Sequence, residues 1–296
     1  MSKRPRIAIV TCARTDIPMT DNEPLRDALT DRGAAAELVI WDDPEADWTR
    51  YDAAIVRTTW DYFDKVEAFR RWLEEVAGST RVFNDAAILR WNIDKHYLLH
   101  LEEAGAPIVP TRIANRSALP DVVASMQAEH GPTAVKPTIG GGAKGLRLLE
   151  PGERLRESDF LRVLGPGGAA LVQPIVGSVR ERGEVSLVWI GGRTRYAILK
   201  VPKAGDIRVQ PEWGATYHAA EATAEQIEAA ERSMAACERA VGRPLYARVD
   251  LVELADGSWA LMELEVIEPE IMFAMAPEGA AAMAEALLAA LPYDRT

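Results

Sequence analysis

Three carboxylates and one guanidinium fall on one face of a hairpin that the sequence predicts near the C-terminus. Asp256-Gly257 lies between two runs of alternating apolar residues, and this pattern favours a two-residue turn. Pairing outward from that turn brings two sets of charges together: Asp250 with Glu263, and Arg248 with Glu265. Because side chains alternate between the two faces of a strand, these four lie on the same face.

Directly opposed carboxylates repel each other unless a cation lies between them. Oxygen-only ligands favour a hard divalent cation, so Asp250, Glu263 and Glu265 form a candidate site for Mg²⁺ or Mn²⁺. Arg248 is always charged and presents a planar fork of donors, which suits an oxygen-rich anion. The alternative is a solvated sheet face that carries a surface ion pair.

A cluster of glycines is the second stretch that could do chemistry. Gly140, Gly141 and Gly142 allow close backbone approach, so successive N–H groups can point at an anion, and Lys136 stands just before them. The stretch is not a Walker A loop, because no Gly-Lys-Ser/Thr closes it, and its spacing is wrong for a dinucleotide fingerprint. The alternative is a flexible hairpin tip.

Composition limits the classes of function. The chain has 296 residues, a net charge of −11, 48% hydrophobic and 27% charged residues, as soluble globular proteins do. The acidic balance argues against a general nucleic-acid binder, because no basic face is in surplus. No apolar run approaches the ~20 residues of a membrane span, and the first residues lack the apolar core of a signal peptide. Cys12 and Cys237 lack metal-ligand spacing, so we expect reduced thiols and a cytoplasmic location.

Apolar periodicity predicts the elements that must position these groups. Helices are expected at residues 25–32, 66–76, 88–103, 119–129, 222–240 and 277–291. Strands are expected, besides the hairpin, at residues 6–11, 36–41, 51–57, 81–84, 133–137, 169–176, 184–192 and 195–200. The strand, helix, strand order at the start predicts a small parallel α/β domain.

Polar and aromatic side chains follow the third predicted strand. They are Arg57, Thr58, Thr59, Trp60 and Asp61. In open α/β sheets ligands bind beyond the carboxyl ends of strands, so these residues are candidate substrate contacts. The alternative is a helix start, with Thr59 or Asp61 as its N-cap.

The order of these features resembles the ATP-grasp superfamily, and the resemblance covers nearly the whole chain. It rests on a small α/β domain, two lysines, a Gly-rich loop, an apolar strand with Gln, a strand with Glu and the carboxylate hairpin. The resemblance implies an α/β (α+β) fold of three domains, with the nucleotide held between two of them. It implies an N-terminal domain at 1–92, a central lid domain at 93–175 and a C-terminal domain at 176–296.

The resemblance also implies roles for single residues. Residues at ATP-binding positions are Lys95, Lys136, Gly140, Gly141, Gly142, Gln173, Ile175, Val176 and Glu184. Asp250, Glu263 and Glu265 match the positions that hold Mg²⁺ (or Mn²⁺), and two ions are implied. The family often has Asn at the third position, so Glu265 is a departure that adds negative charge. Arg248 matches the arginine beside the transferred phosphate, and we expect Lys200 and Arg208 to hold substrate or the γ-phosphate.

A narrower resemblance is to the ATP-grasp subgroup that includes cycloserine synthetase, an O-ureido-D-serine cyclo-ligase. The sequence segments that carry this resemblance lie at residues 57–62, 90–95, 205–210 and 263–270. It implies an ATP-dependent carboxylate–amine ligase that forms an acyl phosphate on a small amino-acid-like substrate. Its partners would be ATP and the small carboxylate. A homodimer is the default expectation for the assembly, and the composition indicates neither a nucleic-acid nor a membrane partner. The alternatives are a two-substrate amide or peptide ligase, a small-molecule kinase and an ATP-binding module without chemistry.

Overall fold

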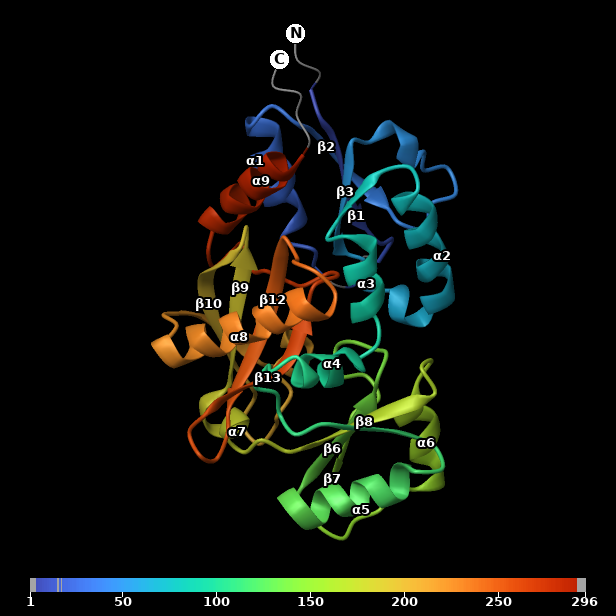
Figure 1. Ribbon diagram of the computed structural model, residues 1–296, viewed down its shortest axis with the longest axis vertical. Helices are drawn as coiled ribbons and strands as arrows, with labels where there is room; N and C mark the ends of the chain where they lie inside the picture. The colour runs from blue at the N-terminus through green and yellow to red at the C-terminus, as the bar shows by residue number, and fades with distance from the viewer. Residues whose placement is uncertain (1–3, 15, 17, 292–296) are drawn as a thin grey trace.

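The computed structural model describes residues 4–14, 16 and 18–291, and its strands form three separate sheets (Figure 1). The strands of these sheets lie at 6–83, 112–174 and 184–265, in chain order. The outer limits of the predicted first and third domains, at 1 and 296, lie outside the described residues. No described helix combines the length and the apolar character that crossing a membrane requires.

The N-terminal sheet is parallel, with strand order β2-β1-β3-β4. Its strands are β1 (Arg6–Thr11), β2 (Ala35–Ile40), β3 (Ala53–Thr58) and β4 (Arg81–Phe83). Its helices are α1 (Asn22–Asp31), α2 (Val66–Ala77) and α3 (Ala86–Asn92), with short 3₁₀ turns η1 (Trp48–Arg50) and η2 (Tyr62–Asp64). Helix α2 places Phe69, Leu73 and Val76 on one buried face, as the helical period requires.

The central sheet is antiparallel, with strand order β5-β8-β6-β7. Its strands are β5 (Arg112–Asn115), β6 (Thr133–Pro137), β7 (Arg147–Leu149) and β8 (Ala169–Pro174). Helices α5 (Leu119–His130) and α6 (Glu157–Leu164) pack on it around a core that contains Val135, Val163 and Val172. In Figure 1 this sheet and its two helices form the green lobe.

The C-terminal sheet is antiparallel, with strand order β11-β10-β9-β12-β13. Its strands are β9 (Glu184–Ile190), β10 (Arg193–Val201), β11 (Thr216–Ala220), β12 (Tyr246–Glu253) and β13 (Trp259–Glu265). Its helices are α4 (Tyr97–Glu103), α7 (Ser178–Arg182), α8 (Ala224–Ala240) and α9 (Glu278–Ala290), and η3 (Pro211–Trp213) precedes β11. Thr223 and Gln226 form a capping box that starts α8 where the sequence predicts a helix.

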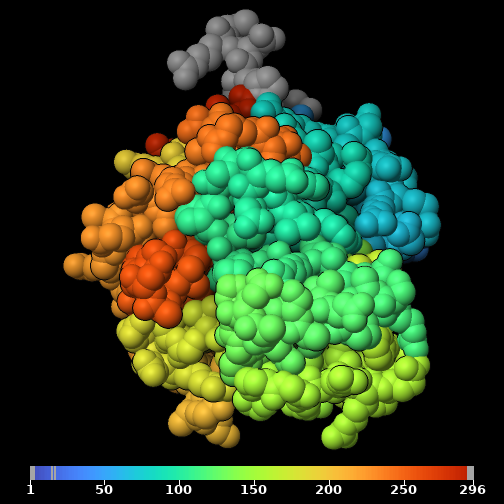
Figure 2. Space-filling view, turned by 60° about the horizontal axis from the view of Figure 1, so that its bottom comes forward, coloured from blue at the N-terminus to red at the C-terminus, as the bar shows by residue number. Residues whose placement is uncertain are grey.

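The N-terminal and C-terminal sheets share a hydrophobic core. Helix α9 packs against α1, and the two lie side by side in Figure 1. Leu29 of α1 and Leu287 of α9 belong to one buried cluster with Ile190 of β9 and Phe273. The central lobe has its own core, and Figure 2 shows its green surface against the yellow and orange surface of the C-terminal lobe. Close packing of the first and third regions therefore leaves the central lobe as the most separate part.

The pairing predicted for the hairpin is confirmed, but the predicted turn is wrong. Strands β12 and β13 pair Arg248 with Glu265 and Asp250 with Glu263. Gly257 has a positive φ of 83° while Asp256 does not, and Leu254 N–H bonds to the Ser258 carbonyl, so the loop has three residues. A bulge at Met262 inserts one unpaired residue on β13 and restores the predicted register at the charged positions.

The helix predicted at 88–103 is also wrong as a single element. Helix α3 ends at Asn92 and α4 begins at Tyr97, and Lys95 lies in the break. Lys95 N–H donates to the carbonyl of Thr138 at 2.8 Å, and the Thr138 hydroxyl contacts the Asp94 carboxylate at 3.3 Å. These contacts to the start of the Gly-rich loop replace the helical hydrogen bonds that periodicity alone predicted.

Candidate active site

Arg248 and the Asp250 carboxylate form the centre of a buried charge network on the hairpin face. Arg248 Nε donates to Asp250 Oδ1 at 2.9 Å, and Nη2 donates to Oδ2 at 2.9 Å. The same Nη2 reaches Glu265 Oε1 at 2.5 Å, so the guanidinium bridges both carboxylates. Although burial raises the pKa of the Asp250 carboxyl, Arg248 and Lys200 more than offset this and hold that pKa well below its usual range.

Lys200 of β10 joins this network from two strands away, across β9. Its Nζ lies 2.5 Å from Glu184 Oε1 and 3.2 Å from Asp250 Oδ2, and only 3% of the residue is exposed. Burial disfavours its ammonium, but Asp250 and Glu184 outweigh burial and raise the pKa of Lys200. Ser186 completes the shell by donating its hydroxyl to Asp250 Oδ1 at 2.5 Å. The predicted catalytic Lys200 and the predicted ATP-binding Glu184 are therefore paired with each other here.

Lys95 and Lys136 converge on the remaining hairpin carboxylate. Lys95 Nζ lies 3.1 Å from Glu263 Oε1 and donates to the Gly140 carbonyl at 2.7 Å. Lys136 Nζ lies 3.9 Å from Glu263 Oε2. Burial raises the pKa of Glu263, but the two ammonium groups outweigh burial and lower it. The structure thus brings together charges from three distant parts of the chain: the break before α4, strand β6 and strand β13.

Carboxylates outnumber cations around this network. Burial, reinforced by Asp250 and Glu263, raises the pKa of Glu265 to about 7. Burial, reinforced by Glu265, raises the pKa of Glu268 to about 8. Among the described residues no three acidic, His or Cys side chains already stand in a metal-binding group. The surplus of oxygen donors nevertheless fits a hard divalent cation, which would offset the negative charge that the four cationic side chains leave uncompensated.

The Gly-rich loop contacts both outer regions of the molecule. A Cβ on Gly141 would lie 2.6 Å from the Phe63 ring, which belongs to η2 of the N-terminal domain. Gly142 has a positive φ of 61°, and its carbonyl accepts a hydrogen bond from Trp213 Nε1 at 3.2 Å. The loop is therefore held between η2 on one side and η3 on the other, and glycine at 141 is required by the close approach of the ring.

The end of β8 and the two residues after it carry three of the predicted ATP-binding positions. Gln173 is buried in β8, and its Nε2 donates to the Thr111 hydroxyl at 2.9 Å. The N–H of Ile175 donates to the Pro132 carbonyl at 2.8 Å. Ile175 and Val176 are half-buried. Because the N–H of Ile175 is already bonded, a ligand there would use the carbonyls of these two residues or the N–H of Val176.

Arg208 does not join the hairpin network in this structure. Its guanidinium bonds to both carboxylate oxygens of Asp206 and lies over the ring of Trp213, 3.8 Å from the centroid. Trp213 in turn bonds to Gly142 of the Gly-rich loop. Arg208 therefore stacks on Trp213, the side chain that joins η3 to this loop, and does not lie beside Asp250.

The predicted substrate residues at the end of β3 and just after it are largely enclosed. Arg57, Thr58 and Thr59 are at most 1% exposed. The Thr58 hydroxyl bonds to a second hydroxyl on β1, and Asp61 accepts from the Trp41 ring N–H at 2.7 Å. Trp60 Nε1 donates to the Glu268 carbonyl at 3.0 Å. The geometry thus favours a supporting role for these residues over direct contact with a ligand.

Comparison with known proteins decides the family. The cycloserine biosynthesis protein DcsG of Streptomyces lavendulae is 30% identical, over 95% of this chain and 97% of that protein. The crystal structure of D-cycloserine synthetase DcsG superposes with a TM-score of 0.87 at 30% identity, covering 97% of this chain and 100% of that one. This chain belongs to the D-cycloserine synthetase family of ATP-grasp ligases.

Two further comparisons agree with that placement. The model of the N-terminal domain of D-cycloserine synthetase DcsG matches residues 7–84. The D-alanine–D-alanine ligase of Bacillus anthracis superposes with a TM-score of 0.68 over 96% of each chain, and at 14% identity it shows the shared fold alone. The predicted ATP-grasp fold and the predicted activity of an ATP-dependent, ADP-forming carbon–nitrogen ligase are confirmed at the level of the family.

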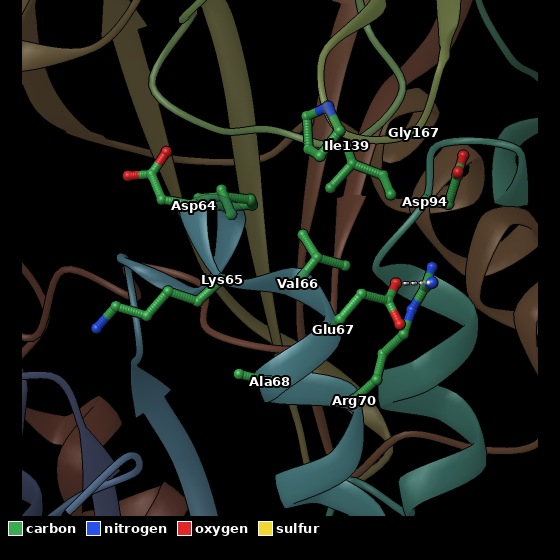
Figure 3. A pocket seen from close by; sticks show the side chains of 11 residues that line it. Asp64, Lys65, Val66, Glu67, Ala68, Arg70, Asp94, Ile139 and Gly167 are labelled. Atoms are coloured by element: carbon green, nitrogen blue, oxygen red, sulfur yellow. Dashed lines mark hydrogen bonds and ion pairs between the residues drawn. The ribbon is translucent and has the colours of Figure 1, made fainter.

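A cavity of about 430 Å³ in this ligase lies at the N-terminus of α2, and Ile139, the residue before Gly140, is part of its lining (Figure 3). Val66 and Ile139 point into it, and Glu67 pairs with Arg70 at 2.8 Å. Lys65 extends away from it toward Asp42, at 2.6 Å. The described residues around this cavity do not include the hairpin carboxylates, so it is a gap between the N-terminal and central regions.

Sequence reasoning missed several residues that shape the site of this ligase. Asp21 directly precedes α1, and its side chain makes no cap for that helix but accepts hydrogen bonds from the backbone after β13. Ser186 alternates correctly to face Asp250, but a lone serine on a strand carries no signal. Glu268 and Glu270 lie in the segment 263–270 that supported the family resemblance. Their negative charge was the feature of the sequence that could have indicated a role at the site.

Gly141→Ala is expected to lower kcat/KM for ATP about tenfold, because the new methyl would displace the loop from the Phe63 ring. Steady-state release of ADP measures the effect. Gly177→Ala is the control, since a Cβ there meets nothing within 4 Å. The double variant Gly141→Ala/Phe63→Ala should recover most of the loss, and equal activity of Gly141→Ala and the wild type would contradict the close contact.

Glu268→Gln is expected to raise the melting temperature of the ligand-free ligase by several degrees near about pH 9 and hardly at all near about pH 5. The pKa of Glu268 is raised to about 8 from 4.5, so the folded protein binds this proton more tightly than the unfolded chain. Its ionisation therefore costs stability progressively as pH rises through that window, and amide replacement removes the cost. Exposed Glu75→Gln is the control, and parallel pH profiles for Glu268→Gln and the wild type would refute this assignment.

Proposed function

We propose that this ligase activates the carboxylate of a small amino acid with ATP and closes a ring within the same molecule, converting O-ureido-D-serine into D-cycloserine. The observation that carries the proposal is the likeness along the whole chain to D-cycloserine synthetase, together with the buried network around Arg248. One small molecule that supplies both reacting groups benefits from an effective concentration that two separate substrates lack.

The proposed reaction has two chemical steps. A carboxylate oxygen attacks the γ-phosphorus of ATP, and ADP leaves, which produces an acyl phosphate. The ureido nitrogen bonded to oxygen then attacks the acyl carbon, loses its proton, and inorganic phosphate leaves as the ring closes. Hydrolysis of the remaining carbamoyl group, with one water, releases CO₂ and NH₃. Water must be kept from the acyl phosphate, and we assign that task to the Gly-rich loop.

Each residue of the network would have a separate role in these two steps. Arg248, with its planar fork of donors, would hold the oxygens of the phosphoryl group in transfer, while Glu265 and Asp250 fix its orientation. Lys95 and Lys136 would offset the charge of the ATP phosphates, and their present partner Glu263 would turn to the metal. Lys200 would hold substrate carboxylate or γ-phosphate oxygens.

The proposed metal is Mg²⁺ or Mn²⁺, held by Asp250, Glu263 and Glu265, and two ions match this number of carboxylates. When bound, it would neutralise phosphate charge. We further propose that Gln173 with the backbone of Ile175 and Val176 holds adenine, and that Glu184 holds the ribose hydroxyls once ATP separates it from Lys200. A homodimer and a cytoplasmic location complete the proposal.

Incubation with ATP, Mg²⁺ and O-ureido-D-serine tests this function, with ADP and the cyclic product both measured. We expect stoichiometric ADP and D-cycloserine, and little of either with O-ureido-L-serine. ADP release only with a pair of amino acids would instead identify a two-substrate amide ligase. Accumulation of a stable phosphorylated product would identify a kinase, and ATP binding without any ADP would identify a module without chemistry.

A further inference from the structure

The segment that follows β13 is tied to the N-terminal domain by one buried carboxylate. Asp21 Oδ2 accepts hydrogen bonds from the N–H groups of Ile271, at 2.7 Å, and Met272, at 3.0 Å. Asp21 Oδ1 accepts from the N–H of Phe273 at 2.8 Å. Asp21 is only 2% exposed, and charge-assisted bonds of this kind are about twice as strong as neutral ones. Three consecutive peptide units are thereby held in place.

Arg57 holds the same segment one peptide unit earlier. Its Nη2 donates to the Pro269 carbonyl at 2.9 Å and lies 3.6 Å from Asp21 Oδ2. The side chain is fully buried, with its guanidinium over the ring of Tyr246. Within the described residues, Nε and Nη1 of Arg57 have no hydrogen-bond partner. A buried cation with unpaired donors costs stability, so stabilisation of the fold does not by itself account for it.

The peptide unit whose N–H bonds to Asp21 also contacts Arg248. The carbonyl of Glu270 accepts a hydrogen bond from Arg248 Nη1 at 3.2 Å. This carbonyl and the N–H of Ile271 belong to one planar peptide unit, in which the two groups point in opposite directions. Asp21 therefore binds one side of this unit and Arg248 binds the other. A rigid plane connects the N-terminal domain to the guanidinium of the hairpin network.

We propose that Asp21 and Arg57 are positioning residues, which set the place of the Arg248 guanidinium by holding the peptide between Glu270 and Ile271. The inference rests on the proposed function, in which Arg248 holds the transferred phosphoryl group, and it extends that function to the N-terminal domain. It also explains why a charged side chain is buried in β3: Arg57 reaches the active site through the backbone of another segment and not through a ligand.

A double-variant cycle tests this proposal, because residues that act through a third lose their effect when the third is changed. Arg57→Met, Arg248→Lys and the double variant are compared by steady-state ADP release and by the amount of ATP bound per chain. Arg57→Met is expected to lower kcat about tenfold or more without changing ATP stoichiometry or KM for ATP. In the Arg248→Lys background the same change should alter kcat by less than about twofold.

Thr80→Val is the matched control, because it removes a buried hydroxyl that donates to the Trp48 carbonyl at 2.6 Å, within the N-terminal domain. Its effect on kcat should be small and equal in both backgrounds. Arg57→Lys keeps a charged donor and should recover part of the loss. If Arg57→Met fails to bind ATP because it does not fold, Arg57→Lys is carried through the same cycle.

Two outcomes would contradict the proposal that Asp21 and Arg57 position Arg248. Unchanged kcat in both Arg57 variants would show that the contact to Pro269 does not matter for turnover. Equal fold-losses with and without Arg248→Lys would show a general structural effect. Failure of the proposed function is visible elsewhere: wild-type protein would release no ADP with O-ureido-D-serine. Full activity of Arg248→Lys alone would contradict both the role assigned to Arg248 and the positioning role of Asp21 and Arg57, which depends on it.

Discussion

Asp250→Asn is expected to slow ATP-dependent ligation by about 10³-fold while ATP still binds. The Asp250 carboxylate accepts from Arg248 and Ser186 and lies 3.2 Å from Lys200, so it is the point where the cationic groups meet. An amide in its place carries no charge and directs an N–H₂ group at one of these donors. Arg248 would then lose its bidentate partner, and the proposed metal would lose a ligand.

Asp256→Asn is the matched control for this experiment, because it makes the same chemical change at the exposed tip of the same hairpin. Mg²⁺-dependent ADP release and the affinity for ATP are measured for both variants. We expect wild-type rates for Asp256→Asn. Turnover of Asp250→Asn within about tenfold of the wild type would remove Asp250 from the proposed metal and transfer site.

Lys200→Met is expected to lower the free energy of unfolding by about 3–5 kcal/mol, which is the usual cost of removing one partner from a buried ion pair. Without the ammonium, the carboxylates of Glu184 and Asp250 remain buried near each other. The pKa of Lys200 is raised in the folded protein, so its contribution is complete below the unfolded value of 10.5 and is lost only as pH rises through the higher folded value. The loss should therefore be nearly constant between about pH 6 and about pH 9.

Urea unfolding of the ligand-free protein measures this change, and exposed Lys203→Met is the control for loss of one lysine. The double variant Lys200→Met/Glu184→Gln should recover part of the stability, because it removes the charge of the carboxylate that lies 2.5 Å from Lys200 Nζ. A loss below about 1 kcal/mol, the range of surface ion pairs, would mean that solvent reaches these carboxylates.

The charge pattern of the hairpin could be deduced from the sequence because strand pairing is a local, periodic property. The two-residue alternation by itself assigns Arg248, Asp250, Glu263 and Glu265 to one face, and the observed pairing agrees. The prediction of the turn was nevertheless wrong, and the correct pairing resulted from two deviations that cancel: a three-residue loop and the bulge at Met262. Bulges depend on packing of neighbouring strands, which short patterns do not record.

Local patterns also placed Lys136 before the Gly-rich loop, and most helices and strands close to their observed limits. They failed at Lys95, where the contact with Thr138 divides a predicted helix in two. The short strands β5, β7 and β11 were missed. Strand β5 pairs with β8 far along the chain, and β7 and β11, with three and five residues, are too short to show a clear alternation. Such elements obtain their stability from tertiary contact and not from their own propensity.

The sequence by itself determined the chemistry of this ligase: which carboxylates share a face, which lysines accompany a Gly-rich loop, and therefore which family the chain resembles. The tertiary structure alone decided what Arg57 and Asp21 do. Arg57 meets Pro269 across 212 residues, and Asp21 meets Ile271 across 250 residues. Periodicity and spacing report neighbours along one strand or helix, whereas these contacts exist only because the N-terminal and C-terminal regions share one packed core.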